Sequence, residues 1–211
     1  MRAKEHWDTV YETKSITEVS WFQREARISL ELITRVAPGL GSAIVDVGGG
    51  ASTLVDGLLG RGYRNVTVLD IASAAVDAAR ARLGPKSANA RWVVADALAH
   101  PFPPQSVDVW HDRAVFHFLT SPADRQAYVA QVTRALRPDG HVIVATFAAD
   151  GPARCSGLDV CRYGPEELHQ EFGHSFELIA HLREEHVTPS GTRQWFQYCL
   201  CAFRPTQSAA A

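Results

Sequence analysis

The sequence has little net charge, few cysteines and no long apolar run, and each shortage excludes a class of protein. Its 211 residues carry 21 Lys and Arg against 23 Asp and Glu without a strongly basic segment, so nucleic acid is not expected as a partner. No apolar run approaches the length that spans a membrane, and residues 1–7 lack the apolar core of a signal peptide. These absences favour a cytoplasmic protein with no membrane partner.

The four cysteines include no CxxC pair, so the sequence predicts no metal ligand set of the usual spacing. In a chain without signs of secretion, reduced thiols are expected, and they are interpreted first as small buried side chains. Cys199 and Cys201 would face the same side of a strand. A metal or metalloid site that joins this pair to Cys155 is the alternative.

Apolar runs alternate with helical patterns through the first two thirds of the chain, which predicts βαβ units and a parallel sheet. Strands are expected at 43–47, 65–69, 91–95, 107–111 and 141–147, and helices at 20–37, 52–59, 72–83 and 121–136.

The pattern changes after Phe147. A long loop is expected over 148–164, followed by a short helix from Pro165 and strands at 176–182 and 194–203. A turn sequence joins the last two strands, so they are expected to pair antiparallel. The sequence therefore predicts an α/β fold: a Rossmann-like, doubly wound sheet of seven strands, mostly parallel, with a C-terminal antiparallel hairpin.

One domain is expected over residues 1–204, with a disordered tail at 205–211. The stretch that organises this domain is Ile44–Ser52, in which a β-rich run ends in three glycines and a helical pattern follows. Glycine allows a sharp turn and lets a ligand approach the main chain, and a helix N-terminus there makes a cradle for a nucleotide-like cofactor. The stretch reads D-x-G-x-G-x-S from Asp46, so it lacks the third glycine of the dinucleotide fingerprint. Ser52, in its place, is expected to cap the helix.

Two further acids end the next two strands. Asp70 follows the second strand, where a carboxylate can accept hydrogen bonds from both hydroxyls of a ribose. Asp96 follows the third strand, where an acid could take the exocyclic amine of adenine. One such acid would be only a helix cap, but three acids beside a glycine turn indicate an adenosine-containing cofactor.

With these residues the chain resembles the class I S-adenosylmethionine-dependent methyltransferases over nearly its whole length. The resemblance implies that Gly48 and Gly50 border the amino-acid part of S-adenosylmethionine, that Asp70 binds its ribose and that Asp96 binds its adenine. The product would be S-adenosylhomocysteine. Further cofactor-binding candidates are Asp46, Gly49, Ser52, Ile71, Ala97, His111 and Trp21.

Two other functions stay open as alternatives. A nicotinamide-dependent oxidoreductase would need a glycine near Ser52 and further parallel strands in place of the terminal hairpin. A non-catalytic module would bind the cofactor without methylating any acceptor.

Acceptor residues are expected beyond the carboxyl ends of the strands. His111 or Asp112 is expected near the methionine part of the cofactor. Arg113 either holds an anionic acceptor or pairs with Asp112. His117 is a candidate base, because histidine titrates near neutral pH, or else a residue that flanks a helix.

Residues 1–37 are expected to form a helical cap over the cofactor site. Its aromatic residues either cover the sulfonium, whose charge attracts ring faces, or pack in the core. Long inserted loops often carry binding residues, which adds two candidates from the loop after Phe147. The substrate candidates are Trp7, Tyr11, Phe22, Arg154 and Cys155.

Short motifs point to two kinds of acceptor. Trp110–Ala114 with Arg125 and Tyr128 resembles the thiopurine and related thiol methyltransferases. His6–Tyr11 and Ser20–Phe22 resemble a group that includes protein-lysine methyltransferases. We favour a small-molecule acceptor, such as a thiol or another soft nucleophile, and expect a monomer or homodimer; a protein lysine is the alternative acceptor.

Overall fold

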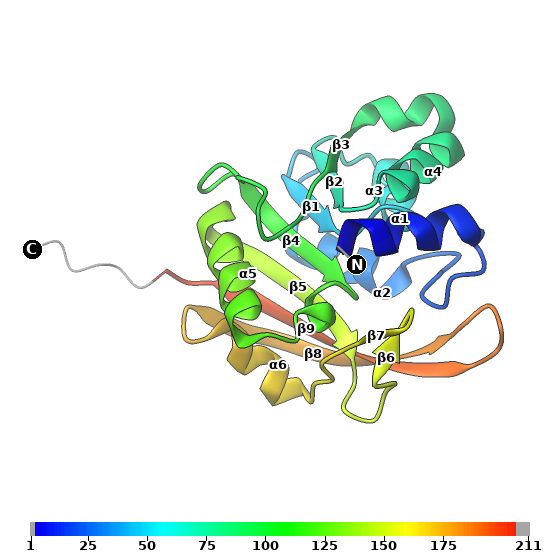
Figure 1. The fold of residues 1–211 in the computed structure, drawn as a ribbon. Coiled ribbons are helices and arrows are strands. Elements are labelled where there is room, and N and C mark those ends of the chain that lie inside the picture. Colours follow the sequence, from blue (N-terminus) through cyan, green and yellow to red (C-terminus); the bar gives the residue numbers. More distant parts are fainter. Residues whose placement is uncertain (1–2, 206–211) are drawn as a thin grey trace, which may run out of the picture.

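The computed structural model describes residues 3–205, in which a seven-stranded sheet lies between helices on both faces (Figure 1). The strand order is β3-β2-β1-β4-β5-β9-β8. The strands of this sheet are β1 (Ile44–Val47), β2 (Val66–Asp70), β3 (Ala90–Val94), β4 (Val107–Arg113), β5 (Leu136–Phe147), β8 (Phe176–Val187) and β9 (Arg193–Phe203).

The pairing confirms the predicted fold class. Strands β1 to β5 are parallel to one another, whereas β9 runs antiparallel to both β5 and β8. The helices are α1 (Ala3–Thr13), α2 (Arg27–Val36), α3 (Leu54–Gly60), α4 (Ser73–Leu83), α5 (Pro122–Ala135) and α6 (Pro165–Phe172), with 3₁₀ turns η1 (Gly84–Asn89) and η2 (Phe116–Phe118). Positions 206–211 of the expected tail lie outside the described residues.

Each face of the sheet buries its own core. The β1 strand is buried along its whole length, as expected for the centre of a parallel sheet. Its Val45 and Val47 pack with α5 and α6, whereas Ile44 packs on the other face with α2 and α3. Leu30 and Ile33, three residues apart on α2, are fully buried, so the apolar stripe of that helix faces the sheet.

The structure moves three predicted boundaries by several residues and adds a strand pair to one predicted loop. The helix expected at 20–37 begins only at Arg27, because the residues before it are held by other contacts: Gln23 donates to Glu184, and its carbonyl accepts from Thr53. Pairing with neighbouring strands extends β5 back to Leu136 and β8 on to Val187, past the expected ends. The loop at 148–164 carries a small antiparallel pair, β6 (Arg154–Cys155) and β7 (Leu158–Asp159). Within residues 3–205, no helix is long and apolar enough to cross a membrane.

A buried polar chain joins β4 to α5. Trp110 donates its Nε1–H to the Tyr128 hydroxyl at 2.9 Å, and this hydroxyl donates to Asp112 Oδ2. Asp112 also accepts the backbone N–H of Val115 at 2.9 Å and of Phe116 at 3.0 Å, so it holds the turn that follows β4. The three side chains have no exposed surface, so water does not replace a lost partner readily.

We expect Tyr128→Phe to lower the free energy of unfolding by about 1–3 kcal/mol, because it leaves a buried carboxylate and a buried indole N–H short of a partner. Urea denaturation measures the change. Thr133→Ala on the same helix removes an exposed hydroxyl and should change stability by less than about 0.5 kcal/mol. Equal effects of the two substitutions would contradict a stabilising role for the hydrogen bonds that join Trp110, Tyr128 and Asp112.

Candidate active site

A cavity of about 310 Å³ lies at the carboxyl ends of β1, β2 and β4. Its walls include Gly48 of the glycine turn, the end of β2 at Asp70 and Ile71, and the residues after β4. A smaller cavity of about 40 Å³ adjoins it, and the two share Gly48 and Arg113. Most of the residues predicted to form a site are therefore brought together at one edge of the sheet.

The glycine turn needs its glycines for two different reasons. Gly48 has a φ of +68°, and a Cβ there would lie 2.0 Å from Val115 Cγ2. Gly50 has no room for a side chain, since a Cβ would lie 2.6 Å from Asp70 Oδ2. Ser52 Oγ accepts the backbone N–H of Leu54, the first residue of α3, at 3.1 Å, but the N-cap position itself is Thr53, one residue later than predicted.

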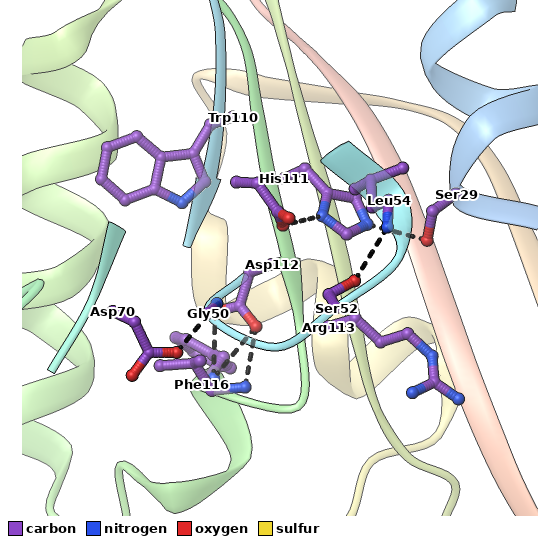
Figure 2. A network of polar contacts seen from close by, with 12 residues as sticks. Ser29, Gly50, Ser52, Leu54, Asp70, Trp110, His111, Asp112, Arg113 and Phe116 are labelled. Atoms are coloured by element: carbon purple, nitrogen blue, oxygen red, sulfur yellow. Dashed lines mark hydrogen bonds and ion pairs between the residues drawn. The ribbon is translucent and has the colours of Figure 1, made fainter. Parts of the chain in front are cut away.

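The Asp70 carboxylate is fixed at the end of β2 (Figure 2). Its oxygens accept the backbone N–H of Gly50 at 3.0 Å and of Ala72 at 2.8 Å. The side chain lines the larger cavity while only 6% of the residue is exposed, and this burial raises its pKa to about 6. A carboxylate held in this way can accept hydrogen bonds from a ligand hydroxyl.

Asp96 lies on the same cavity as Asp70. It follows β3, is exposed, and accepts the backbone N–H of Leu98 at 2.9 Å. Ile71 and Ala97, which follow the two acids, also line this cavity. The cavity thus presents three acidic residues, the third being Asp124, together with apolar surface, which suits a nucleoside better than a purely apolar ligand.

The smaller cavity is lined by Asp46 and His111 together with Gly49, Ser52 and Phe22. Asp46 Oδ1 lies 2.7 Å from His111 Nδ1, and the other oxygen of Asp46 is buried without a hydrogen-bond partner. An unpaired buried carboxylate oxygen is costly, so a donor from a ligand would be favourable here.

Aromatic side chains from the N-terminal segment form a wall of the larger cavity. The ring of Trp7 meets those of Trp21 and Phe118 edge-on, at centroid distances of 5.7 and 5.0 Å. Trp21 Nε1 donates to the Tyr11 hydroxyl at 3.3 Å, and Tyr11 lines both cavities. The half-buried Trp7 and Tyr11 therefore lie at the cavity beside a small alanine cluster, whereas Trp21 lines the cavity and also packs against the core to which α2 belongs.

Arg113 pairs with Glu184 and not with Asp112, so the expected Asp112 pair is wrong. The Arg113 Nη2 lies 3.2 Å from Glu184 Oε2, and its Nε donates to the Tyr198 hydroxyl at 3.0 Å. The guanidinium lies over the Phe196 ring, 3.9 Å from the ring centroid. Asp112 is occupied by its own partners. The Arg113 charge is thus largely compensated where the side chain lines the two cavities.

Gly50 and Asp112 line neither cavity, and nor do two residues predicted on the acceptor side, His117 and Arg154. His117 is fully buried with its Nδ1 3.4 Å from the Phe147 N–H, and burial lowers its pKa to about 3, so the ring is neutral at pH 7. Arg154 is exposed and forms an ion pair with Asp159 at 2.7 Å. Their neighbours Phe118 and Cys155 line the larger cavity, so the sequence located the right segments but not the direction of these two side chains.

The cysteines occupy both faces of the sheet. Cys155 lines the larger cavity, and burial raises the pKa of its thiol to about 11. Cys199 and Cys201 lie side by side as predicted, with their sulfurs 3.3 Å apart, but they pack in the core of the opposite face. The alternative of one metal site shared by these three cysteines is therefore wrong. Residues 3–205 contain no group of three or more His, Cys, Asp or Glu that could hold a metal ion.

Comparisons with known proteins agree with this geometry. Residues 44–140 match a family model described as a methyltransferase domain. The chain is 30% identical over 129 residues to the O-methyltransferase cnsE of Penicillium expansum, covering 60% of this chain and 45% of the relative. It is 27% identical over 173 residues to the ubiquinone/menaquinone biosynthesis C-methyltransferase UbiE of Roseobacter denitrificans, covering 80% and 62%. The chain thus spans about half to two thirds of the length of these two relatives.

A third relative, human EEF1A lysine methyltransferase 2, is 23% identical over 193 residues, covering 85% of this chain and 76% of its own. Among solved structures, one described as "Conversion of a Disulfide Bond into a Thioacetal Group during Echinomycin Biosynthesis" has a TM-score of 0.76 at 20% identity, covering 99% and 95% of the two chains. The Haemonchus contortus phosphoethanolamine N-methyltransferase 2 in complex with S-adenosyl-L-methionine has a TM-score of 0.73 at 15% identity, covering 97% and 60%. These structural matches show a shared fold.

We expect the raised pKa values of Asp70 and Asp112 to make the free energy of unfolding fall as pH rises from about 4 to about 6, against the rise contributed by His117, whose lowered pKa keeps it neutral in the folded chain. In this range Asp70 and Asp112, whose pKa values burial raises to about 6, hold protons that an unfolded chain with carboxyl pKa values of about 4 has released. Asp70→Asn should make this fall smaller, and urea denaturation at several pH values measures it. Asp77→Asn, at an exposed position on α4, is the control and should leave the slope unchanged. The same slope in Asp70→Asn as in the unaltered protein would contradict the assignment.

Proposed function

This chain belongs to the class I S-adenosylmethionine-dependent methyltransferases, and from that premise we propose that it transfers a methyl group to a small-molecule acceptor. The observation that carries the proposal is the Asp70 carboxylate, fixed by the Gly50 amide inside a cavity that aromatic rings wall on another side. The methyltransferase domain matched at 44–140 includes the glycine turn, Asp70 and Asp96.

The described residues fit the cofactor of this family. Asp70 would accept hydrogen bonds from the ribose hydroxyls, and Asp96 with Ala97 would meet the adenine. The amino-acid part would lie over Gly48 and Gly49 in the smaller cavity, where the unpaired oxygen of Asp46 is available to an ammonium group.

S-adenosylmethionine, when bound, supplies an electrophilic methyl group on a sulfonium, which a nucleophile displaces in line. The residues of this chain then position the acceptor and exclude water. The rings of Trp7 and Trp21 suit a cation and keep the cavity dry. Burial raises the pKa of the Tyr11 hydroxyl far above its usual range, so Tyr11 contributes a ring and a neutral hydroxyl rather than a base.

The cavity favours a small, weakly charged acceptor. Its volume of about 310 Å³ is near the lower limit for small-molecule sites, so little room is left once a cofactor is seated. The compensated charge of Arg113 suits a neutral or soft nucleophile, such as a thiol, better than a strongly anionic one. We therefore propose Arg113 as an acceptor contact ahead of His117, whose low pKa and full burial disfavour proton transfer to it.

A protein lysine is the second candidate acceptor. It is supported by the long match to human EEF1A lysine methyltransferase 2 and by the His6–Tyr11 and Ser20–Phe22 motifs. Cytoplasmic location, a single domain over 1–204 and a monomeric or homodimeric state stay predictions from the sequence.

We expect Asp70→Ala to abolish cofactor binding in a protein that stays folded, because the ribose loses its acceptor. Calorimetric titration with S-adenosylhomocysteine tests this, and thermal unfolding monitors the fold. Asp77→Ala removes an exposed acid on α4 and should bind normally. Unchanged affinity in Asp70→Ala would refute the ribose assignment.

We expect the purified protein to transfer labelled methyl groups from S-adenosylmethionine to members of a panel of thiols and other small nucleophiles, and Asp70→Ala to show no transfer. The same assay with cell-extract protein separates the two candidate acceptors. Label in a protein band with none in the small molecules would favour the lysine acceptor. Tight cofactor binding without transfer to anything would favour a non-catalytic module.

A further inference from the structure

A series of buried hydrogen bonds runs from Asp46 on β1 through His111 on β4 to Ser29 on α2. His111 lies between two partners, with Nδ1 2.7 Å from Asp46 Oδ1 and Nε2 2.8 Å from Ser29 Oγ (Figure 2). The three residues come from β4, β1 and α2, and their exposed fractions are only 3%, 2% and 1%. Because water hardly reaches these groups, they depend on protein partners for their hydrogen bonds, and Ser29 also has a side-chain hydrogen bond with Tyr198.

The donor and acceptor capacities of the three groups decide which atom donates in each of these hydrogen bonds. A carboxylate only accepts hydrogen bonds, so His111 donates its Nδ1–H to Asp46. In a neutral ring, Nε2 is then left to accept the proton of the Ser29 hydroxyl. Ser29 therefore fixes the orientation of the imidazole, and the imidazole fixes one oxygen of Asp46.

The second oxygen of Asp46 is what this arrangement leaves free. It is buried without a partner, on a residue that lines the smaller cavity. It also faces the glycine turn closely, since a Cβ on Gly49 would lie 2.2 Å from it. The chain thus holds a carboxylate with one oxygen occupied and the other available to a donor in the cavity.

We propose that Ser29 and His111 are positioning residues for the amino-acid end of the cofactor. Ser29 orients His111, and His111 holds Asp46 so that its free oxygen meets the ammonium of the methionine part. This inference rests on the proposed function, and it gives Ser29, which no sequence motif marks, a role in selecting ligands that carry the amino-acid group.

Two ligands separate this role from a general loss of fold. S-adenosylhomocysteine has the amino-acid group, whereas 5′-methylthioadenosine keeps the adenosine and the thioether but lacks it. We expect Ser29→Ala to weaken the calorimetric affinity for S-adenosylhomocysteine about fivefold, the effect of one hydrogen bond, and that for 5′-methylthioadenosine by less than about twofold. Thr34→Ala, which removes a hydroxyl bonded within the same helix, should change neither affinity.

A double-mutant cycle tests whether Ser29 acts through Asp46. Asp46→Asn should weaken S-adenosylhomocysteine selectively, and adding Ser29→Ala to it should cost no further affinity. Equal losses for both ligands, or a full additional loss in the double variant, would overturn the proposal. If Ser29→Ala does not fold, Ser29→Cys keeps the side-chain volume with a weaker hydrogen bond and carries the same expectation. If the unaltered protein binds neither ligand, the cofactor assignment fails; if it binds both without these selective losses, only the positioning role fails.

Discussion

The hydrogen bond from the Gly50 amide to the Asp70 carboxylate is the contact on which the site depends. It joins the turn after β1 to the end of β2, and it is possible only because Gly50 has no side chain to collide with that carboxylate. Burial opposes the charge, as the raised pKa of Asp70 shows, and the two backbone amides offset part of this cost. The fold thus keeps a carboxylate, whose charge is disfavoured by burial, at the cavity where a ligand can donate hydrogen bonds to it.

Much of this arrangement follows from local sequence, and the remainder depends on contacts between distant residues. Glycines after an apolar strand and acids at strand ends are local patterns, so the fold class and the residues around Asp70 were predictable. The partner of Arg113 was not, because Glu184 is 71 residues away on β8. The contact of Ser29 with His111 could not be predicted either, since the two residues are 82 positions apart and no local feature of the helix indicates the partner. The hydrogen bond that Ser52 accepts at the start of α3, in contrast, joins residues only two apart, so a role for this serine at the helix start could be predicted.

The N-terminal segment contributes to the site in a different way from the sheet. Its aromatic residues form the wall by ring contacts with Phe118, and Asp8 accepts the Ser73 N–H at 3.1 Å, which joins α1 to the start of α4. The segment between α1 and α2 is held by several polar contacts, among them Gln23 with Glu184 and His186 with the Ser20 carbonyl, and by its buried Val19. The cofactor part of the site therefore rests on strand ends, whereas the aromatic wall rests on side-chain contacts.

This division has an evolutionary consequence. The matched methyltransferase domain begins at residue 44, after the aromatic segment, so the cavity acids Asp70 and Asp96 and the rings of Trp7 and Trp21 lie in separate stretches of the gene. Substitutions before residue 27 can reshape the aromatic wall while leaving Asp70 and its amide partners untouched. Descendants of one ancestor can therefore diversify in what they methylate without reinventing how they hold the methyl donor.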